Sequence, residues 1–258
     1  LRDAISREAK NLSVRSFNMA NVNRLTNHWL SFAKSFNYDI SAAGAKMIAR
    51  SRELAQNDPY AKKILRLLEK NVVGPKGFLF RNKSGDYTRD EKTGEYSFVF
   101  DKLANLKIEE AFWDWSKKEN CTVTGKTSFR KFCQQLIRSA WCDGEVFIQI
   151  LKGKSYGKYA FQLKVIDPIY CDHKLTKDLG NGNAIVMGVE VNSNLKPLRY
   201  WFRKTSAYKE VQAGYMYEGN YDVVEAENII HLYIQEVPGQ IRGITQFAPA
   251  GIRMKMLY

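Results

Sequence analysis

The 258-residue sequence has no long apolar run, and no segment approaches the roughly 18–20 apolar residues that a membrane-spanning helix needs. Its first residues lack the apolar core of a signal peptide, so secretion is not predicted. The four cysteines are too sparse for a disulfide scaffold and contain no CxxC pair, which favours reduced thiols in the cytoplasm. We therefore expect a soluble protein.

Acidic residues are also comparatively few. The chain has 27 Asp and Glu against 40 Lys and Arg, a net charge of +13, and about half of that excess lies in residues 1–70. A strongly basic protein is expected to have a polyanionic neighbour, although charge says nothing about fold. The remaining composition, 45% hydrophobic and 26% charged, is that of a globular protein of one large or two smaller domains.

The two ends of the sequence are unusual. The chain does not begin with Met, and it stops at 256–258 inside an apolar, helix-prone stretch, so we expect a piece of a longer protein. Residues 1–40 are basic and polar with scattered aromatic side chains, which predicts an N-terminal arm with one short helix. An arm that wraps a partner and a mobile terminus both fit this composition.

Helical patterns dominate residues 41–142. Ser41 begins a helix that runs to Gln56, and Asp58 followed by Pro59 gives the N-cap and first position of a second helix. This second helix is expected to end at Gly74-Pro75. After a strand, turn and strand over 78–100, with the turn at 82–86, two further helices are predicted. They run from about Leu103 to Lys118, burying Ala104, Ile108, Ala111, Phe112 and Trp115, and from Ser128 to Trp141.

Strand patterns dominate the rest of the chain. Five segments rich in β-branched and aromatic residues are separated by Gly- and Asn-rich turns, which is typical of antiparallel meanders. The predicted strands are 146–151, 161–166, 186–191, 198–202 and 229–233. Helices followed by strands predict an α+β fold, with a helical N-terminal part, an antiparallel β-rich part and the start of a long helix at the end.

Several short motifs resemble phosphate-, dinucleotide- or metal-binding sites, but each lacks residues that such a site requires. Gly125-Lys126-Thr127 lacks the earlier glycine and the preceding strand of a phosphate-binding loop, so we interpret it as a helix-start turn. Gly180-Asn181-Gly182 lacks the third glycine of a dinucleotide fingerprint and is interpreted as a hairpin turn. Cys171-Asp172-His173 cannot complete a tetrahedral metal site, and His28 and His231 are isolated. We therefore predict no metal and no cofactor.

Asp143 and Glu145 flank a glycine turn at a helix–strand junction, and paired acid catalysis is one interpretation of them. Solvated turn residues are the ordinary interpretation of such a pair, and nothing in the sequence supplies a leaving-group site. We predict no catalytic residues and no enzyme activity, and keep a hydrolase using Asp143 and Glu145 only as a rival hypothesis.

Four basic residues recur at helical spacing: Lys46 with Arg50, and Lys62 with Arg66. Side chains four residues apart lie on one face of a helix, so each pair predicts a basic ridge. Contact with phosphate is one interpretation, and a solvated face or a subunit contact is the other. Because no aromatic residues are interleaved with these pairs, electrostatic contact is favoured over sequence-specific readout.

The order of several longer segments is more informative than any single motif. These segments are 50–61 (RSRELAQNDPYA), 71–74 (NVVG), 109–115 (EEAFWDW) with Cys121, 143–147 (DGEVF), 165–168 (VIDP), 181–183 (NGN), 187–191 (MGVEV), 197–201 (PLRYW), 229–233 (IIHLY), 238–244 (PGQIRGI) and 247–249 (FAP). Taken together and in this order, from about Ile40 to Tyr258, they closely resemble the lambda-type portal proteins of tailed bacteriophages.

This resemblance implies a function for the chain. Portal subunits form a ring, usually twelve-fold, at one vertex of the capsid, and carry no catalytic site. The ring docks the terminase, passes double-stranded DNA through its channel for packaging and ejection, and later joins the head–tail connector. Contacts with the major capsid or scaffold protein are implied as well, as are assembly in the host cytoplasm and a place in the virion of a phage or prophage.

The resemblance also divides the chain into an arm over 1–40, a wing domain over 41–244, and the start of the helix leading to the stem over 245–258. The rest of the portal would lie beyond this sequence, which would make the chain the N-terminal, wing-side half. The alternative is a basic module that binds double-stranded DNA through the helices of residues 41–73. It predicts salt-dependent binding that is lost when Lys46, Arg50, Lys62 and Arg66 are replaced by Glu.

Overall fold

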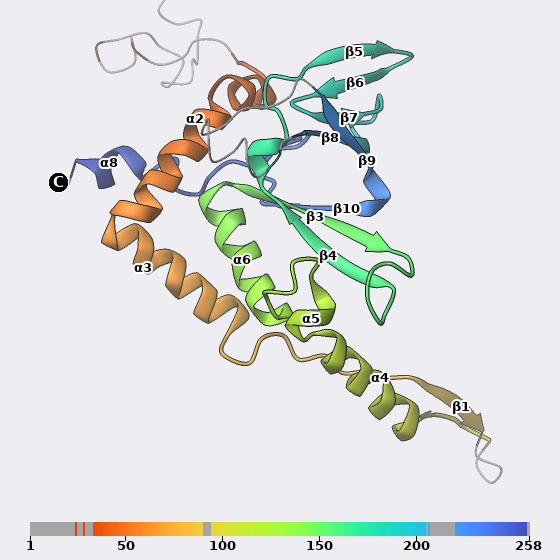
Figure 1. Cartoon of the computed structure of the whole chain (residues 1–258). Coiled ribbons are helices and arrows are strands. Elements are labelled where there is room, and N and C mark those ends of the chain that lie inside the picture. The colour runs from red at the N-terminus through yellow and green to blue at the C-terminus, as the bar shows by residue number, and fades with distance from the viewer. Residues whose placement is uncertain are drawn as a thin grey trace, which may run out of the picture. The chain divides into compact units, whose positions relative to one another are not determined.

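The computed structural model describes residues 24, 28, 33–89, 94–204, 206 and 220–256. The chain divides into two units, 1–35 and 36–258, and most of the predicted arm lies outside the described residues. In the second unit, helices come first and antiparallel sheets follow, so the predicted α+β class is confirmed (Figure 1).

The first two helices of the second unit, α2 (Phe36–Asn57) and α3 (Pro59–Leu68), meet at a capped corner. The Asp58 carboxylate accepts a hydrogen bond from the backbone N–H of Ala61 at 2.8 Å, as the sequence predicts, and Pro59 opens α3. A π-helical turn over 69–73 then leads to Gly74.

Helix α2 begins at Phe36, earlier than the predicted start at Ser41. The cause is tertiary. The side-chain amide of Asn37 donates to the Gly239 carbonyl oxygen and accepts from the Ile241 N–H, and Ile40 is completely buried among the strands. These contacts stabilise an additional helical turn that local sequence does not favour.

A separate lobe contains the hairpin β1 (Gly85–Arg89) and β2 (Tyr96–Phe100) and helix α4 (Lys102–Trp115). The predicted turn at 82–86 is wrong, because β1 already starts at Gly85. Asn105 of α4 holds this segment by donating to the Ser84 carbonyl oxygen and accepting from the Ser84 N–H and the Asn82 amide. Local turn propensity is overridden by a contact with a residue 21 positions away.

The predicted burial along α4 is also wrong. Ile108 is 42% exposed and Ala111 is exposed, while Ala104, Phe112 and Trp115 are only partly buried. Few elements pack against this helix: Phe80 stacks on Phe112 at 4.6 Å between ring centroids, and Trp115 donates to the Phe161 carbonyl oxygen. The lobe therefore keeps much of its apolar surface in solvent.

After the short α5 (Lys118–Cys121), helix α6 (Phe129–Cys142) packs against a three-stranded antiparallel sheet. This sheet has the order β10 (Ile229–Tyr233), β3 (Glu145–Lys152) and β4 (Phe161–Ile166). The segment around Gly125 is the turn before α6, as predicted. Ser128 occupies the N-cap position but forms no capping hydrogen bond with its side chain.

A second antiparallel sheet is a five-stranded meander, and it includes two strands that the sequence did not predict, β5 and β9. Its strands are β5 (Lys177–Gly180), β6 (Asn183–Val186), β7 (Val189–Val191), β8 (Pro197–Arg203) and β9 (Tyr221–Glu225). The β5–β6 connection at Asn181-Gly182 is the predicted hairpin turn. The predicted single strand over 186–191 is wrong, because Met187 and Gly188 have φ angles of 51° and 81° and form a turn between β6 and β7.

Three apolar clusters hold these layers together. The largest lies between the two sheets and includes Phe147, Val189, Tyr200 and Phe202, with Ile40 of α2 packed into it. A second joins α6 to the three-stranded sheet, and a third joins α2, α3 and the segment around Phe247. Two short 3-10 helices (Pro168–Tyr170, Ala226–Asn228) and α8 (Gly251–Lys255) complete the described elements.

Candidate functional site

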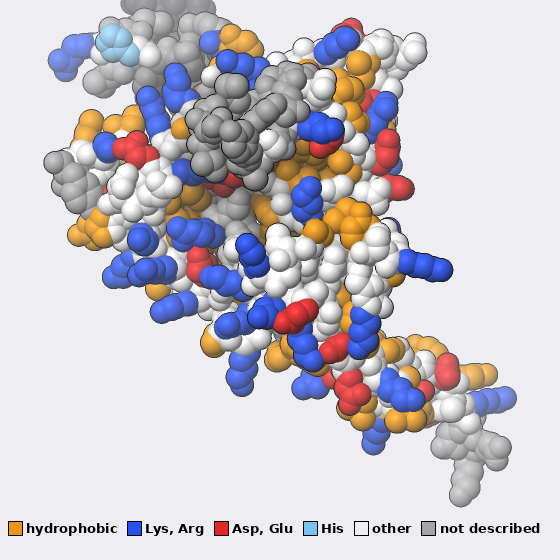
Figure 2. Space-filling model, viewed as in Figure 1, with side chains coloured by type: hydrophobic (Ala, Val, Ile, Leu, Met, Phe, Trp, Pro, Cys, Tyr) orange, Lys and Arg blue, Asp and Glu red, His pale blue; other side chains and the backbone are white. Residues whose placement is uncertain are grey.

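The four basic residues singled out in the sequence all lie exposed on helices. Lys46 and Arg50 belong to α2, and Lys62 and Arg66 belong to α3. None of them forms an ion pair with another described residue. Helix α3 contains no acidic residue, and neither does the neighbouring α6. In Figure 2, Lys and Arg side chains gather over α3 and α6, which gives this side of the molecule a positive field.

The acid pair at the α6–β3 junction is buried rather than solvated. Asp143 is 6% exposed and Glu145 is completely buried, so the expectation of solvated turn residues is wrong. The junction is brought against residues 243–245 by two glycines. Gly144 has a φ of +93°, and a Cβ there would lie 2.2 Å from the carbonyl carbon of Ile244, while a Cβ on Gly243 would lie 2.1 Å from the Gly144 oxygen. Two motifs far apart in sequence thus meet backbone to backbone.

Glu145 binds three groups at once. Arg242 donates to its carboxylate through Nε at 2.8 Å and Nη2 at 2.5 Å, and the backbone N–H of Gly243 donates at 2.9 Å. The Nε2 atom of His231 lies 2.9 Å from the same carboxylate. Since a buried charge is tolerated only when it is paired and hydrogen-bonded, this set of donors is what allows Glu145 to remain in the core.

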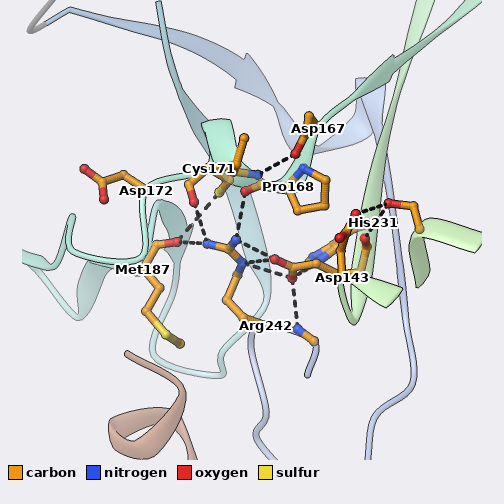
Figure 3. A network of polar contacts seen from close by, with 12 residues as sticks. Asp143, Asp167, Pro168, Cys171, Asp172, Met187, His231 and Arg242 are labelled. Carbon is orange, nitrogen blue, oxygen red and sulfur yellow. Dashed lines mark hydrogen bonds and ion pairs between the residues drawn. The ribbon is translucent and has the colours of Figure 1, made fainter. Parts of the chain in front are cut away.

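Arg242 is itself completely buried and is the centre of a larger network (Figure 3). Beyond Glu145, its guanidinium donates to the backbone oxygens of Cys171 and Met187, and more weakly to that of Pro168 at 3.4 Å. The Met187 oxygen is aimed at Arg242 by the tight turn at Met187-Gly188. Arg242 therefore ties the loop that carries it to β3, to the segment after β4 and to the β6–β7 turn.

The charge state of this network follows from its surroundings. Burial favours the neutral form of Glu145, but Arg242 and His231 outweigh burial and hold its pKa well below the ordinary value. Burial lowers the pKa of His231 despite its hydrogen bond to Glu145. The imidazole is therefore neutral near pH 7 and donates its Nε2–H to an ionised carboxylate. A carboxylate kept ionised in this way cannot act as a general acid.

Asp143 is bound in a second ion-pair cluster. Arg52 of α2 donates to both of its carboxylate oxygens, at 2.8 and 3.0 Å, and to Asp167 at 2.6 Å. Ser139 of α6 donates to Asp143 as well. The two carboxylates of the rival hydrolase hypothesis are therefore committed to separate arginines, and their arrangement joins helices to sheet rather than presenting a reactive pair.

Cys171, Asp172 and His173 point to different partners. Cys171 lies against the Met187 oxygen, and burial raises the pKa of its thiol to about 12. Asp172 accepts from Arg203 and from the Tyr221 hydroxyl. His173 is 4% exposed and packs against Gly44 of α2, and burial first, then Arg242, lowers its pKa to about 4. Within the described residues, no group of three or more His, Cys, Asp or Glu side chains could hold a metal ion.

Two features of the molecule were not anticipated from sequence. Arg242 was noted only as part of a motif, and the burial of Glu145 was not expected, because the partner lies 97 residues away. A glycine beside each of them, Gly144 and Gly243, was the available signal. The described helices also include none that is both long and apolar enough to cross a membrane.

Comparison with known proteins gives the chain a family. The family model described as "Phage portal protein, lambda family" matches residues 22–258. A protein named "Probable portal protein" from Halomonas phage phiHAP-1 is 33% identical over 233 residues, which covers 90% of this chain and 43% of that protein. The chain thus spans about two fifths of the length of this relative. The chain belongs to the lambda family of phage portal proteins.

Proposed function

We propose that the chain is part of a portal subunit that assembles, with copies of itself, into a ring at the unique vertex of a phage capsid. The single observation that carries this proposal is the family match over residues 22–258. The ring, of about twelve subunits in this family, would be the channel through which double-stranded DNA is packaged and later ejected. It would dock the terminase, the major capsid or scaffold protein and the head–tail connector.

The role is structural rather than enzymatic. Both carboxylates at the α6–β3 junction are bound by arginines, which supports a role in stabilising the fold rather than in catalysis. On this proposal residues 41–244 form the wing, and residues 245–258 begin the helix toward the stem. The ring would assemble in the host cytoplasm and remain in the virion.

Electron microscopy and sedimentation of the full-length portal subunit that contains this chain test the ring. We expect closed rings with a central channel, whose subunits can be counted in end-on views. Finding only monomers across a wide range of salt and protein concentrations would contradict the proposal.

A second function is favoured by one observation: Lys46, Arg50, Lys62 and Arg66 are exposed on two helices and form no ion pair with any described residue. On this alternative the helices of residues 41–73 bind double-stranded DNA through its phosphates. The measurement is DNA affinity against salt concentration. Replacing all four residues by Glu should abolish binding and flatten the salt dependence, since each lost phosphate contact lowers the slope by about one. Unchanged binding would remove this alternative.

A further inference from the structure

One face of the β1–β2 hairpin is an uncovered aromatic surface. Side chains alternate between the two faces of a strand, and the register pairs Tyr87 with Phe98 and Gly85 with Phe100. Tyr87, Tyr96, Phe98 and Phe100 therefore share one face, which we call the aromatic face, while Asp86, Thr88, Ser97 and Val99 share the other. Arg89 also lies on the aromatic face, with its guanidinium 6.0 Å from the centroid of the Tyr96 ring. The rings of the aromatic face contact one another, with centroids 5.1 Å apart for Tyr87–Phe98 and for Phe98–Phe100.

This face is exposed to an unusual degree. Tyr87 and Tyr96 are 73% and 69% exposed, and Phe98 and Phe100 are 39% and 49% exposed. Because an aromatic side chain can bury 150–250 Å², these four leave roughly 350–550 Å² of apolar surface in solvent. A two-stranded hairpin is marginally stable alone, and an apolar patch of this size usually marks an interaction site.

Helix α4 extends the apolar surface. Leu103, Leu106 and Trp113 lie along one stripe of the helix and are 66%, 58% and 41% exposed. Figure 2 shows hydrophobic side chains gathered over both α4 and β1. The lobe thus exposes seven large apolar side chains, more than the scattered single residues that an ordinary protein surface shows.

The described part of the chain also contains a second, different apolar surface. Strand β10 is an outer strand of its sheet, and Ile230, Leu232 and the following Ile234 alternate along it with exposures of 48%, 37% and 48%. The strand, IIHLY, has no Lys and no Pro, the residues that usually blunt an edge strand. A head-to-tail ring needs two different surfaces on each subunit that fit each other.

We propose that the aromatic face of one subunit packs against the exposed Ile230–Leu232–Ile234 side of β10 in the next copy of the chain. This contact rests on the proposed function, since it assumes a ring. In this contact the hairpin lobe binds the neighbouring subunit through aromatic side chains, a residue type that often dominates the binding energy of interfaces. Burial in the ring would supply the covering layer that the described residues of this chain do not give the hairpin.

Paired variants of the full-length subunit that contains this chain test the contact. Tyr87→Thr/Tyr96→Thr removes the two most exposed anchors and keeps strand propensity, and Ile230→Thr/Leu232→Thr removes the surface on the other side. Each should raise the protein concentration needed for half-assembly by about tenfold or more, measured by sedimentation. Thermal unfolding of the single subunit should change little, because these side chains are exposed there.

Two control variants replace an exposed apolar side chain by Thr outside the proposed contact. Val99→Thr lies on the opposite face of the hairpin, and Val223→Thr lies on β9, an outer strand of the other sheet. Both residues are exposed, at 53% and 43%, and neither variant should alter assembly. Normal assembly of either test variant would overturn the proposed contact.

Footprinting of the wild-type chain gives a test that does not depend on any variant folding. Hydroxyl radicals should modify Tyr87 and Tyr96 strongly in single subunits and several-fold less in rings. Equal modification in both states, or protection that appears only when other virion proteins have joined the ring, would overturn the assignment to a second copy. A wild-type full-length subunit that never forms rings would contradict the proposed function instead, which separates the two failures.

Discussion

The β-rich part of the molecule buries charged side chains, whereas the hairpin lobe exposes aromatic ones. Both arrangements are costly unless the side chains find partners. Around Arg242, charged side chains are taken out of water and each is given hydrogen-bond partners within the same subunit. In the lobe, aromatic side chains remain in water because nothing in the described part of the chain covers them. Monomeric proteins rarely expose an apolar patch of this kind. The Arg242 network stabilises the fold within one subunit, whereas we expect the aromatic face of the lobe to be buried only when another molecule binds it.

The two parts are also held together differently. In the β-rich part, segments nearly a hundred residues apart meet at backbone distance through Gly144 and Gly243. In the lobe, the ties between the start of the hairpin and its helix are local: Asn105 binds Ser84, and Glu109 accepts a hydrogen bond from the Asn82 N–H. Substitutions in the first part should therefore affect the whole fold, and substitutions in the second should stay local.

The largest expected effect is that of Arg242→Leu. It leaves Glu145 charged and buried without its main partner, which should lower the free energy of unfolding by about 3–5 kcal/mol. Chemical denaturation measures this change. The double variant Arg242→Leu/Glu145→Gln should recover part of the loss, because no unpaired charge remains. Lys158→Met, which breaks an exposed ion pair to Asp114 near the lobe, should change stability far less.

Gly144→Ala should come next. At a φ of +93° an L-residue is strained, and the added Cβ would meet the backbone of Ile244 at 2.2 Å, so we expect a loss of about 2–4 kcal/mol. Gly125→Ala is a matched control with a φ of +62° and no atom within 4 Å of the added Cβ. It should cost only the conformational strain, about 1–2 kcal/mol. Equal losses at the two positions would mean that the close approach at Gly144 is not rigid.

The third prediction concerns pH. Burial lowers the pKa of His173 to about 4, whereas an unfolded His titrates near 6.5. Between these values the unfolded chain binds a proton that the folded chain does not, so stability rises with pH across this window and falls as the solution is acidified. Glu145 adds to the loss below about pH 4.3, because its folded pKa is lowered and its stabilising charge disappears on protonation.

The variant His173→Gln separates these contributions. It should reduce the change in unfolding free energy between pH 6.5 and about 4.5 by about 2 kcal/mol. Part of the pH dependence should remain, because burial also lowers the pKa of His231. Denaturation curves at several pH values measure the slope. An unchanged slope would show that His173 is protonated inside the folded protein, or that another group is responsible.

Local sequence predicted features that depend on neighbouring residues. Asp58 with Pro59 gave the start of α3, Asn181-Gly182 gave a hairpin turn, and the order of patterns gave the α+β class. It did not predict features that depend on distant partners. Glu145 looks like a turn residue until Arg242 is placed beside it, and α2 extends to Phe36 only because Asn37 binds backbone groups about 200 residues away. The turn at Met187-Gly188, which interrupts the predicted strand over 186–191, also depends on a distant residue, because the Met187 oxygen accepts a hydrogen bond from Arg242.

The smallest effect on global stability, and the one that best sharpens the contrast, is expected for Asn105→Ala. Asn105 is 9% exposed and accepts the hydrogen bond of the Ser84 N–H, whereas the Ser84 oxygen also accepts from the Asp101 N–H. Its loss should leave the Ser84 N–H unpaired and cost about 1–2 kcal/mol locally. Because the lobe makes few contacts with the sheets, hydrogen exchange should accelerate in β1 and β2 and in the first turn of α4, while amides of β3 and β10 keep their protection. Faster exchange throughout the sheets would mean that the lobe and the β-rich part unfold together. In the assembled ring the same variant should show little acceleration if the aromatic face is covered by a neighbour, since that contact would hold the hairpin in place of the lost amide.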